Sequence, residues 1–514
     1  MKMQSYSKLR SLFGWLRLSA RMDVCAAFFC IVTAGQISAQ TLTVASRDTL
    51  RYSVEDAVLT ALERNPTVTI QRITHEITDT FRREERAAFD PYLSIGASRN
   101  ENKSQRFLGT RREPVLMETQ RIQYNASASE ALPTGTTVSV DATMGGYTSN
   151  IYTNQYTGSV GVTVTQSLLQ GFGLGANLAG LRQADLDMDI SHFEMKGVAE
   201  GVIADVVRAY WELYLTAEEI DIQEKSVKLA EQQLNESEER VAVGKLPELE
   251  LAAVHAEVAT RREALIQARV SYEQARLQFL FLLNPESLGS WETAVVTTEH
   301  PSIPSDTLEA VDGHVKLGMM YRPDLIQARL QLEKGEIDVV QTRNGLLPQL
   351  DVFITLGRTS YADTFDKAKP DIISDFYDAT AGFTFNIPFV DRTERARYAR
   401  AQHTVGQRGE ALHNLERMVQ RDVRSSYIEV SGSRQLIEAS RISRELQEKK
   451  HAAEQEKFRV GKSTNFLVLQ VQRDYTLSQL TEARSLVSYI SALTNLYLME
   501  GTLLERNHID PGIK

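Results

Sequence analysis

Cysteine is almost absent from this sequence. Among 514 residues there are only two, Cys25 and Cys30, and both lie near the N-terminus. The rest of the chain can therefore form no disulfide bond, and it offers no cysteine zinc site or thiol nucleophile. The nine histidines are scattered and form no His-Glu-x-x-His motif. The sequence predicts no catalytic residue, no cofactor and no metal site, and we do not expect an enzyme.

Long hydrophobic runs are also lacking. Residues 1–39 combine a basic start, an apolar run over 24–32 and small residues ending at Ala39, which is typical of a secretory signal cleaved after Ala39. An uncleaved anchor helix is the alternative, but the run is too short to cross a bilayer. No later stretch approaches the length of a membrane helix. If the mature protein crosses a membrane, we expect it to do so as a β-barrel.

An excess of positive charge is missing as well. The formal net charge is −10, and loss of the basic signal would make it more negative still. This balance disfavours a nucleic-acid partner.

Only thirteen prolines interrupt the chain, and no low-complexity linker divides it. We therefore expect one extended architecture rather than several separate domains.

What the sequence does contain is an internal repeat. Pro66 and Pro323 begin similar segments at one offset, and Gly244 and Gly461 are related by another. Such self-similarity indicates a duplicated architecture. The predicted organisation is a signal peptide at 1–39, a first repeat at 40–299 and a second repeat at 300–514. Each repeat would hold short helices, strands and a long helical hairpin, with hairpin tips near residues 244 and 461.

The two hairpin tips share an Arg/Val/Gly/Lys sequence. In each tip a glycine follows a long helical pattern, and glycine supplies the left-handed residue that ends a helix. We expect one helix from about Leu174 to Val243 and another from about Arg392 to Arg459. The residues predicted to form the tips and to contact a partner are Arg240, Val243, Gly244, Lys245, Arg459, Val460, Gly461 and Lys462.

Between the helices lie segments that alternate apolar and polar residues, the pattern of membrane barrel strands. A soluble β-sandwich is the alternative. The residues predicted to face lipid are Val160, Val162, Val164, Phe383 and Phe385. The first repeat contains two additional alternating segments, at about 121–130 and 136–144. They would either join the sheet or pack elsewhere.

The helix breaks at Asn65-Pro66 and Arg322-Pro323-Asp324-Leu325 resemble those of the TolC-like outer-membrane efflux protein family. So does the strand-to-helix junction at residues 164–173. The resemblance implies a membrane protein of mixed α and β structure, in which outer-membrane β-barrel strands join a long α-helical coiled-coil barrel. It further implies an internally duplicated homotrimer that extends from the outer membrane into the periplasm.

The same resemblance implies a function. The protein would be the passive exit duct of a tripartite efflux pump or a type I secretion system. Its partners would be outer-membrane lipid, a periplasmic adaptor protein, and an inner-membrane pump or ABC transporter. A periplasmic coiled-coil adaptor or scaffold is the alternative function.

Candidate gate residues follow from the family's pattern at the tips. Glu250 occupies the family's carboxylate position, Phe458 its aromatic position without a hydroxyl, and Ser463 the place of a basic residue. Because most charges of the family's gate are missing, we expect closure to depend on packing more than on ion pairs. Glu250 has another interpretation, as an acid favoured by the dipole at a helix N-terminus.

Overall fold

The computed structural model describes residues 50–107, 109, 113–284, 291–303, 308–368 and 377–506. The predicted signal at 1–39 lies outside these residues. The described part of the first repeat contains, in order, β1 (Leu50–Tyr52), α1 (Val54–Arg64), α2 (Pro66–Ala87), β2 (Tyr92–Arg106), β3 (Val115–Leu132), β4 (Thr136–Ser149), β5 (Gln155–Ser167), α3 (Leu174–Asn177), α4 (Ala179–Ala242) and α5 (Leu249–Leu283).

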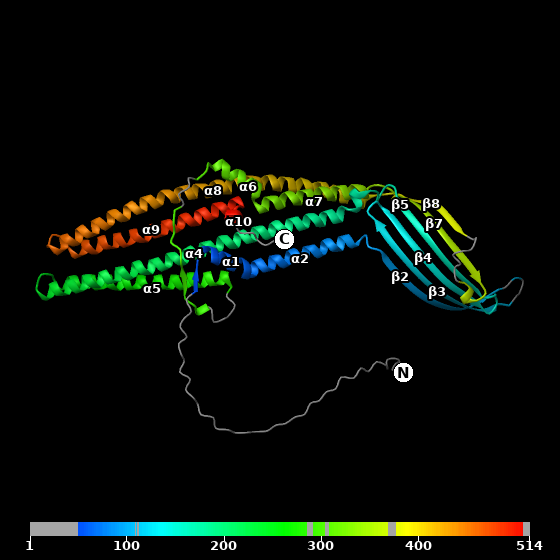
Figure 1. Ribbon diagram of the computed structural model, residues 1–514, viewed down its shortest axis with the longest axis horizontal. Coiled ribbons are helices and arrows are strands. Elements are labelled where there is room, and N and C mark those ends of the chain that lie inside the picture. The colour runs from blue at the N-terminus through cyan, green and yellow to red at the C-terminus, as the bar shows by residue number, and fades with distance from the viewer. Residues whose placement is uncertain are drawn as a thin grey trace, which may run out of the picture. The chain divides into compact units, whose positions relative to one another are not determined.

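The second repeat follows the same order with fewer strands. Its elements are α6 (Val311–Tyr321), α7 (Pro323–Gly345), β7 (Gln349–Ala362), the 3₁₀ helix η2 (Phe365–Ala368), β8 (Asp378–Asn386), α8 (Arg392–Arg459), α9 (Asn465–Glu500) and α10 (Leu503–Arg506). The short strand β6 (Val295–Thr297) comes just before the predicted boundary at residue 300. The long helix α8 packs against α7 and α9, just as α4 packs against α2 and α5 (Figure 1).

Local sequence accounts for where the helices begin. Ser53 accepts a hydrogen bond from the backbone N–H of Asp56 and so caps α1. The Asp56 carboxylate does not complete a capping box, because it accepts from the Ser53 hydroxyl instead. Pro66 and Pro323 each lie in the first turn of a helix, where a missing N–H costs nothing.

One expected helix is broken. The sequence predicts a continuous helix from about Leu174, but α3 ends at Asn177 and α4 begins at Ala179. Leu178 between them has φ −91° and ψ 6°, outside helical values. The Asn177 side chain donates hydrogen bonds to the carbonyls of Gly171 and Gly173, which ties this turn back to the preceding loop.

The six long strands form one antiparallel sheet in the order β2-β3-β4-β5-β7-β8 (Figure 1). The two additional strands therefore join the sheet, since β3 and β4 pair with each other and with β2 and β5. β2 and β8 are the two edges. The small strands β1 and β6 form a separate parallel pair.

Two hydrophobic clusters hold the helices together. The larger lies where α1, α5 and β6 meet α4, and its largest fully buried side chains include Tyr210, Phe279 and Ile203. The smaller one joins α6, α8 and α9 around Val423 and Leu496. Both lie in the middle of the helical region, between the sheet and the hairpin tips (Figure 1).

Candidate functional site

Two features of the described residues could carry a function: the hairpin tips and the two faces of the sheet. At the first tip Gly244 has φ +71°. Its N–H bonds to the carbonyl of Val241, and the N–H of Lys245 bonds to that of Arg240. This is a Schellman ending, in which a left-handed residue satisfies the last carbonyls of a helix.

The second tip has the same geometry. Gly461 has φ +77°, its N–H bonds to the carbonyl of Phe458, and the N–H of Lys462 bonds to that of Lys457. The turns predicted at Gly244 and Gly461 are therefore present in equivalent form. Their roles in contacting a partner stay predictions.

The two tips touch each other within one chain. The guanidinium carbon of Arg240 lies 4.1 Å from the centre of the Phe458 ring, and Arg240 Nη1 donates to the Phe458 carbonyl at 3.3 Å. Phe458 is 4% exposed. A cation above an aromatic face is attracted by the ring's quadrupole, so Arg240 links the end of α4 to the end of α8.

Ser463 is engaged within its own hairpin. Its hydroxyl donates a hydrogen bond to Glu454, which also pairs with Lys457 at 2.9 Å. The hydrogen bond from Ser463, together with Lys457, lowers the pKa of the Glu454 carboxyl. The structure therefore ties Ser463 to an acid that the sequence did not single out.

The third candidate gate residue remains separate. Among the described residues Glu250 makes no side-chain hydrogen bond or ion pair, and it lies in the first turn of α5. Phe458 thus contacts Arg240, and Ser463 contacts Glu454. Neither Phe458 nor Ser463 contacts Glu250.

A buried polar cluster below the tips was not predicted. Gln233 donates to Asn465 at 2.8 Å, and Asn465 donates to Ser237 at 3.3 Å. All three are buried, and they join α4 to the start of α9. Polar residues at helical spacing normally indicate a helix face in contact with solvent. The neighbouring sequence therefore does not distinguish the buried Gln233, Ser237 and Asn465 from exposed polar residues.

Apolar side chains are exposed around both tips. The exposed fraction is 67% for Val243, 86% for Leu249, 58% for Val460 and 68% for Phe466. Exposed apolar groups gathered at one end of a molecule are typical of a protein interaction site.

The sheet has one apolar and one polar face. Residues that pair across neighbouring strands share one face of the sheet. Because side chains alternate along a strand, the next row of paired residues lies on the opposite face. One apolar row consists of Leu93, Ala128, Val140, Val162 and Leu356. The next row, on the other face, consists of Ser94, Ser127, Asp141, Gly161 and Gly357.

The residues predicted to face lipid lie on the apolar face. Val160, Val162 and Val164 share it on β5, and Phe383 and Phe385 share it on β8, where they are 72% and 52% exposed. Their contact with lipid stays a prediction.

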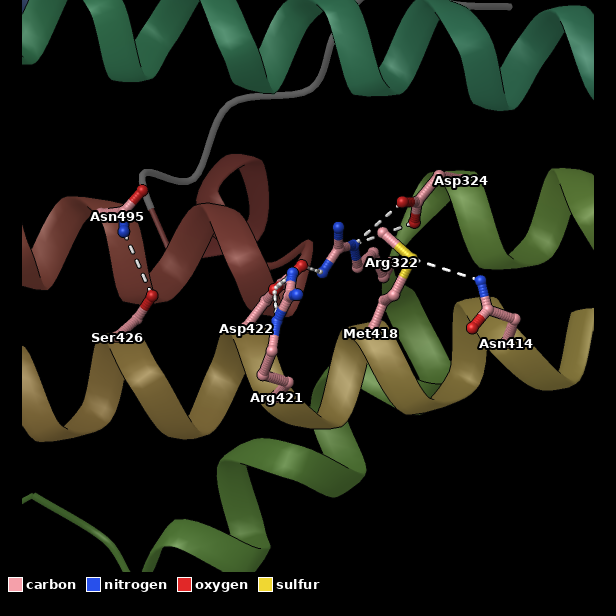
Figure 2. Close-up of polar contacts among 8 residues, drawn as sticks. All are labelled: Arg322, Asp324, Asn414, Met418, Arg421, Asp422, Ser426 and Asn495. Atoms are coloured by element: carbon pink, nitrogen blue, oxygen red, sulfur yellow. Dashed lines mark hydrogen bonds and ion pairs between the residues drawn. The ribbon is translucent and has the colours of Figure 1, made fainter.

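The helix break of the second repeat is held by a charged network, which Figure 2 shows. Arg322 Nε lies 3.0 Å from Asp324 Oδ1, and Arg322 Nη1 lies 3.3 Å from Asp422 Oδ2 on α8. Asp422 also pairs with its neighbour Arg421. In the first repeat the equivalent break is held by Asn65, whose side-chain amide donates to the Leu282 carbonyl.

The described residues offer no metal site and no membrane-spanning helix. No group of three or more His, Cys, Asp or Glu side chains in the described ranges is placed to hold a metal ion. Of the helices in the described part of the chain, none combines the length and apolar character needed to cross a membrane.

Known solved structures share this fold. The chain resembles the CmeC outer membrane channel of Campylobacter jejuni with a TM-score of 0.63 and 14% identity, covering 90% of this chain and 87% of that one. The outer membrane protein VceC of Vibrio cholerae gives a TM-score of 0.64 at 14% identity, covering 87% of this chain and 96% of that one. The fold is therefore that of TolC-like channels, with mixed helix and sheet.

Sequence comparison gives the family. The chain is 24% identical over 325 residues to the pyoverdine export outer membrane protein OpmQ of Pseudomonas putida, covering 60% of this chain. It spans 64% of that relative's length. The family model for outer membrane efflux proteins matches residues 58–284 and 320–502, most of the described chain. That family is one of transport proteins rather than enzymes. The chain therefore belongs to the outer membrane efflux protein family and is a protein of the outer membrane.

Proposed function

We propose that three copies of the chain assemble into a closed tube that is the passive exit duct of an efflux or secretion system. The observation that carries the proposal is the sheet with two unpaired edges and one apolar face. Apolar residues are exposed beside both edges, including Ile95 on β2 at 76% and Phe383 on β8 at 72%. In lipid every backbone polar group needs a partner, so such edges must be closed.

Copies of the same chain can close these edges. The sheet has an even number of strands, all antiparallel, so β8 of one copy is antiparallel to β2 of the next. A ring of copies then continues one uninterrupted hydrogen-bond pattern. The apolar face would meet lipid, and the Ser- and Thr-rich face would line the bore.

The helices offer surfaces for the same assembly. One side of α2 carries a stripe of apolar side chains at helical spacing, each at least half exposed: Ile70, Ile73, Ile77 and Phe81. Such a stripe is suited to packing against a neighbouring helix. A second copy would cover it.

The tips would dock a periplasmic adaptor, and the energy for export would come from an inner-membrane pump or ABC transporter. The exposed Val243, Leu249, Val460 and Phe466 support this role. Replacing Gly244 and Gly461 by bulky residues should abolish export. Trimers should stay intact, because an added Cβ meets nothing within 4 Å at either position and the strain of a left-handed residue acts at the turn itself. Unchanged export would refute the docking role.

Insertion of the protein into the outer membrane tests the proposal that the sheets form a tube. Lysine at Val162 should prevent insertion, because a lysine facing the centre of the bilayer costs about 2–4 kcal/mol. Lysine at the adjacent Thr163, on the polar face, is the matched control and should insert. The readout is a heat-modifiable trimer in outer-membrane fractions. Equal tolerance of both changes, or recovery of the mature chain as a soluble periplasmic protein, would favour the alternative of an adaptor or scaffold.

A further inference from the structure

The polar face of the sheet contains a cavity of about 510 Å³ near the ends of the strands that are farthest from the helices (Figure 1 shows these strand ends). Its lining comes from three adjacent strands, β3, β4 and β5. Two of these are the additional strands of the first repeat. The residues that the argument uses are Arg121, Gln123, Gly145, Tyr147, Gln155 and Thr157.

Arg121 supplies a positive charge without a counter-charge. Among the described residues it makes no hydrogen bond or ion pair, and its guanidinium carbon lies 5.9 Å from the centre of the Tyr147 ring. An arginine held this loosely keeps its planar set of donors available. That set matches the two oxygens of a carboxylate.

The rest of the lining adds hydrogen-bonding groups and a flat surface. Tyr147 lies directly across from Arg121 in the strand register, and Gln155 lies across from Tyr147. The side-chain amides of Gln123 and Gln155 make no hydrogen bond to another described residue, so they are free to bind a ligand. Gly145 lies between Gln123 and Thr157 in the strand register and has no side chain to fill the cavity there.

Negative charge on this face lies elsewhere. Asp141 is six residues from Tyr147 along β4, which is roughly 20 Å in an extended strand. Asp351 and Asp378 share this face but lie on β7 and β8, outside the three strands that line the cavity. An anion approaching the cavity therefore meets the Arg121 charge without a carboxylate beside it.

We propose that the cavity around Arg121 and Tyr147 binds a carboxylate attached to a planar group, such as an aromatic acid. The carboxylate would pair with the Arg121 guanidinium, and the planar group would stack on the Tyr147 ring. The Gln123 and Gln155 amides and the Thr157 hydroxyl would bind its polar substituents. This inference rests on the proposed function, in which the polar face lines the bore. It gives the additional strands a role in binding solutes close to the outer opening.

Benzoate is a suitable probe, and saturation-transfer NMR on the detergent-solubilised full-length protein measures its binding. The substitution Arg121→Gln should weaken binding at least tenfold, and Tyr147→Leu should weaken it several-fold. Arg106→Gln removes the same charge from the same face outside the cavity and should bind like the wild type. Benzamide, which is neutral, should bind weakly to all four proteins, and Arg121→Gln should not change its binding.

Insertion and trimer formation are scored separately for each variant. A heat-modifiable, inserted protein that binds benzoate equally well with and without Arg121 overturns this inference and leaves the proposed function standing. The same holds if an inserted wild-type trimer binds no benzoate. Failure of the wild type to insert would instead overturn the proposed function.

Discussion

The guanidinium of Arg240 lies over the ring of Phe458, 4.1 Å from its centre, and so joins the end of α4 to the end of α8. These residues come from different repeats, more than two hundred positions apart. The contact makes the two tips of one chain a single unit. It also gives the tip a link that depends on an aromatic ring rather than on a carboxylate.

Removing the aromatic ring should loosen this link. Phe458→Leu retains most of the apolar burial but loses a cation–π contact worth about 0.5–2 kcal/mol. Hydrogen exchange of backbone amides at residues 454–466 should accelerate by several-fold. Arg459→Ala is the control, because its side chain is 75% exposed and pairs with Glu456 alone among the described acids. Equal acceleration in both variants would mean that the contact does not hold the tips together.

Two glycines with similar backbone angles should differ in their tolerance of alanine. Gly461 and Gly501 have φ of +77° and +70°, so alanine is strained at both. A Cβ at Gly501 would lie 2.7 Å from the Cα of Arg322 and 2.7 Å from the Tyr321 carbonyl oxygen, whereas a Cβ at Gly461 meets nothing within 4 Å.

Gly501→Ala should therefore cost about 1–3 kcal/mol more than Gly461→Ala, the usual penalty of overpacking. Denaturant unfolding followed by circular dichroism gives the comparison. Similar midpoints for the two variants would show that the backbone at Arg322 can move aside.

The buried carboxyl of Glu200 should make the protein less stable at alkaline pH. Burial raises the pKa of Glu200 to about 7, and the nearby Glu505 adds to this while Lys196 opposes it. The folded state thus prefers the protonated acid. Its contribution to stability is complete below about pH 4.5, the unfolded value, and is lost as pH rises through about 7.

Glu200→Gln mimics the protonated form at every pH. It should raise the free energy of unfolding at pH 8 by up to about 3 kcal/mol and have little effect below pH 5. Melting curves across this range test the expectation. A variant with the same pH dependence as the wild type would contradict it.

The buried imidazole of His451 should make the protein less stable at acidic pH, the opposite of the effect of Glu200. Its ring is buried and stacks on Tyr475 with centres 5.5 Å apart, and burial lowers the pKa of the imidazole. The stacked Tyr475 feels the charges of Glu448, Arg444, Glu482 and Lys225. Because the folded state prefers neutral histidine, its stability contribution is present above the ordinary histidine pKa and is lost as pH falls below it.

His451→Phe keeps a stacked ring that cannot take up a proton. The stability that the wild type loses between pH 7 and pH 5 should be smaller in this variant, as measured by the melting temperature. His413→Phe is the control, because His413 is 70% exposed. An identical loss in the wild type and His451→Phe would place the acid sensitivity elsewhere.

Much of the fold was predictable because its signals are local. The left-handed glycines 244 and 461, the prolines that begin α2 and α7, and the alternation along β5 and β8 each act within a few residues. Their equal spacing in two halves then indicated the order of the elements. The break at Leu178 was missed because the Asn177 side chain that stabilises it bonds to a loop.

The candidate site was less predictable because it is made by contacts between repeats. Nothing near Phe458 in the sequence indicates that Arg240 lies over it. The polar residues Gln233 and Asn465 resemble exposed helix residues until the two hairpins are side by side. Whether β3 and β4 join the sheet depends on pairing with β2 and β5, and alternation alone does not specify a partner strand.

The two edge strands differ in length, and this affects the outer opening. β2 has 15 residues and β8 has 9, so six residues of β2 exceed the length of β8. In a closed ring the outer part of β2 would extend past its neighbour. That part, residues 101–106, is polar on both faces, so it can remain in water. The rim of the tube would then be uneven, with three raised segments standing above the membrane surface.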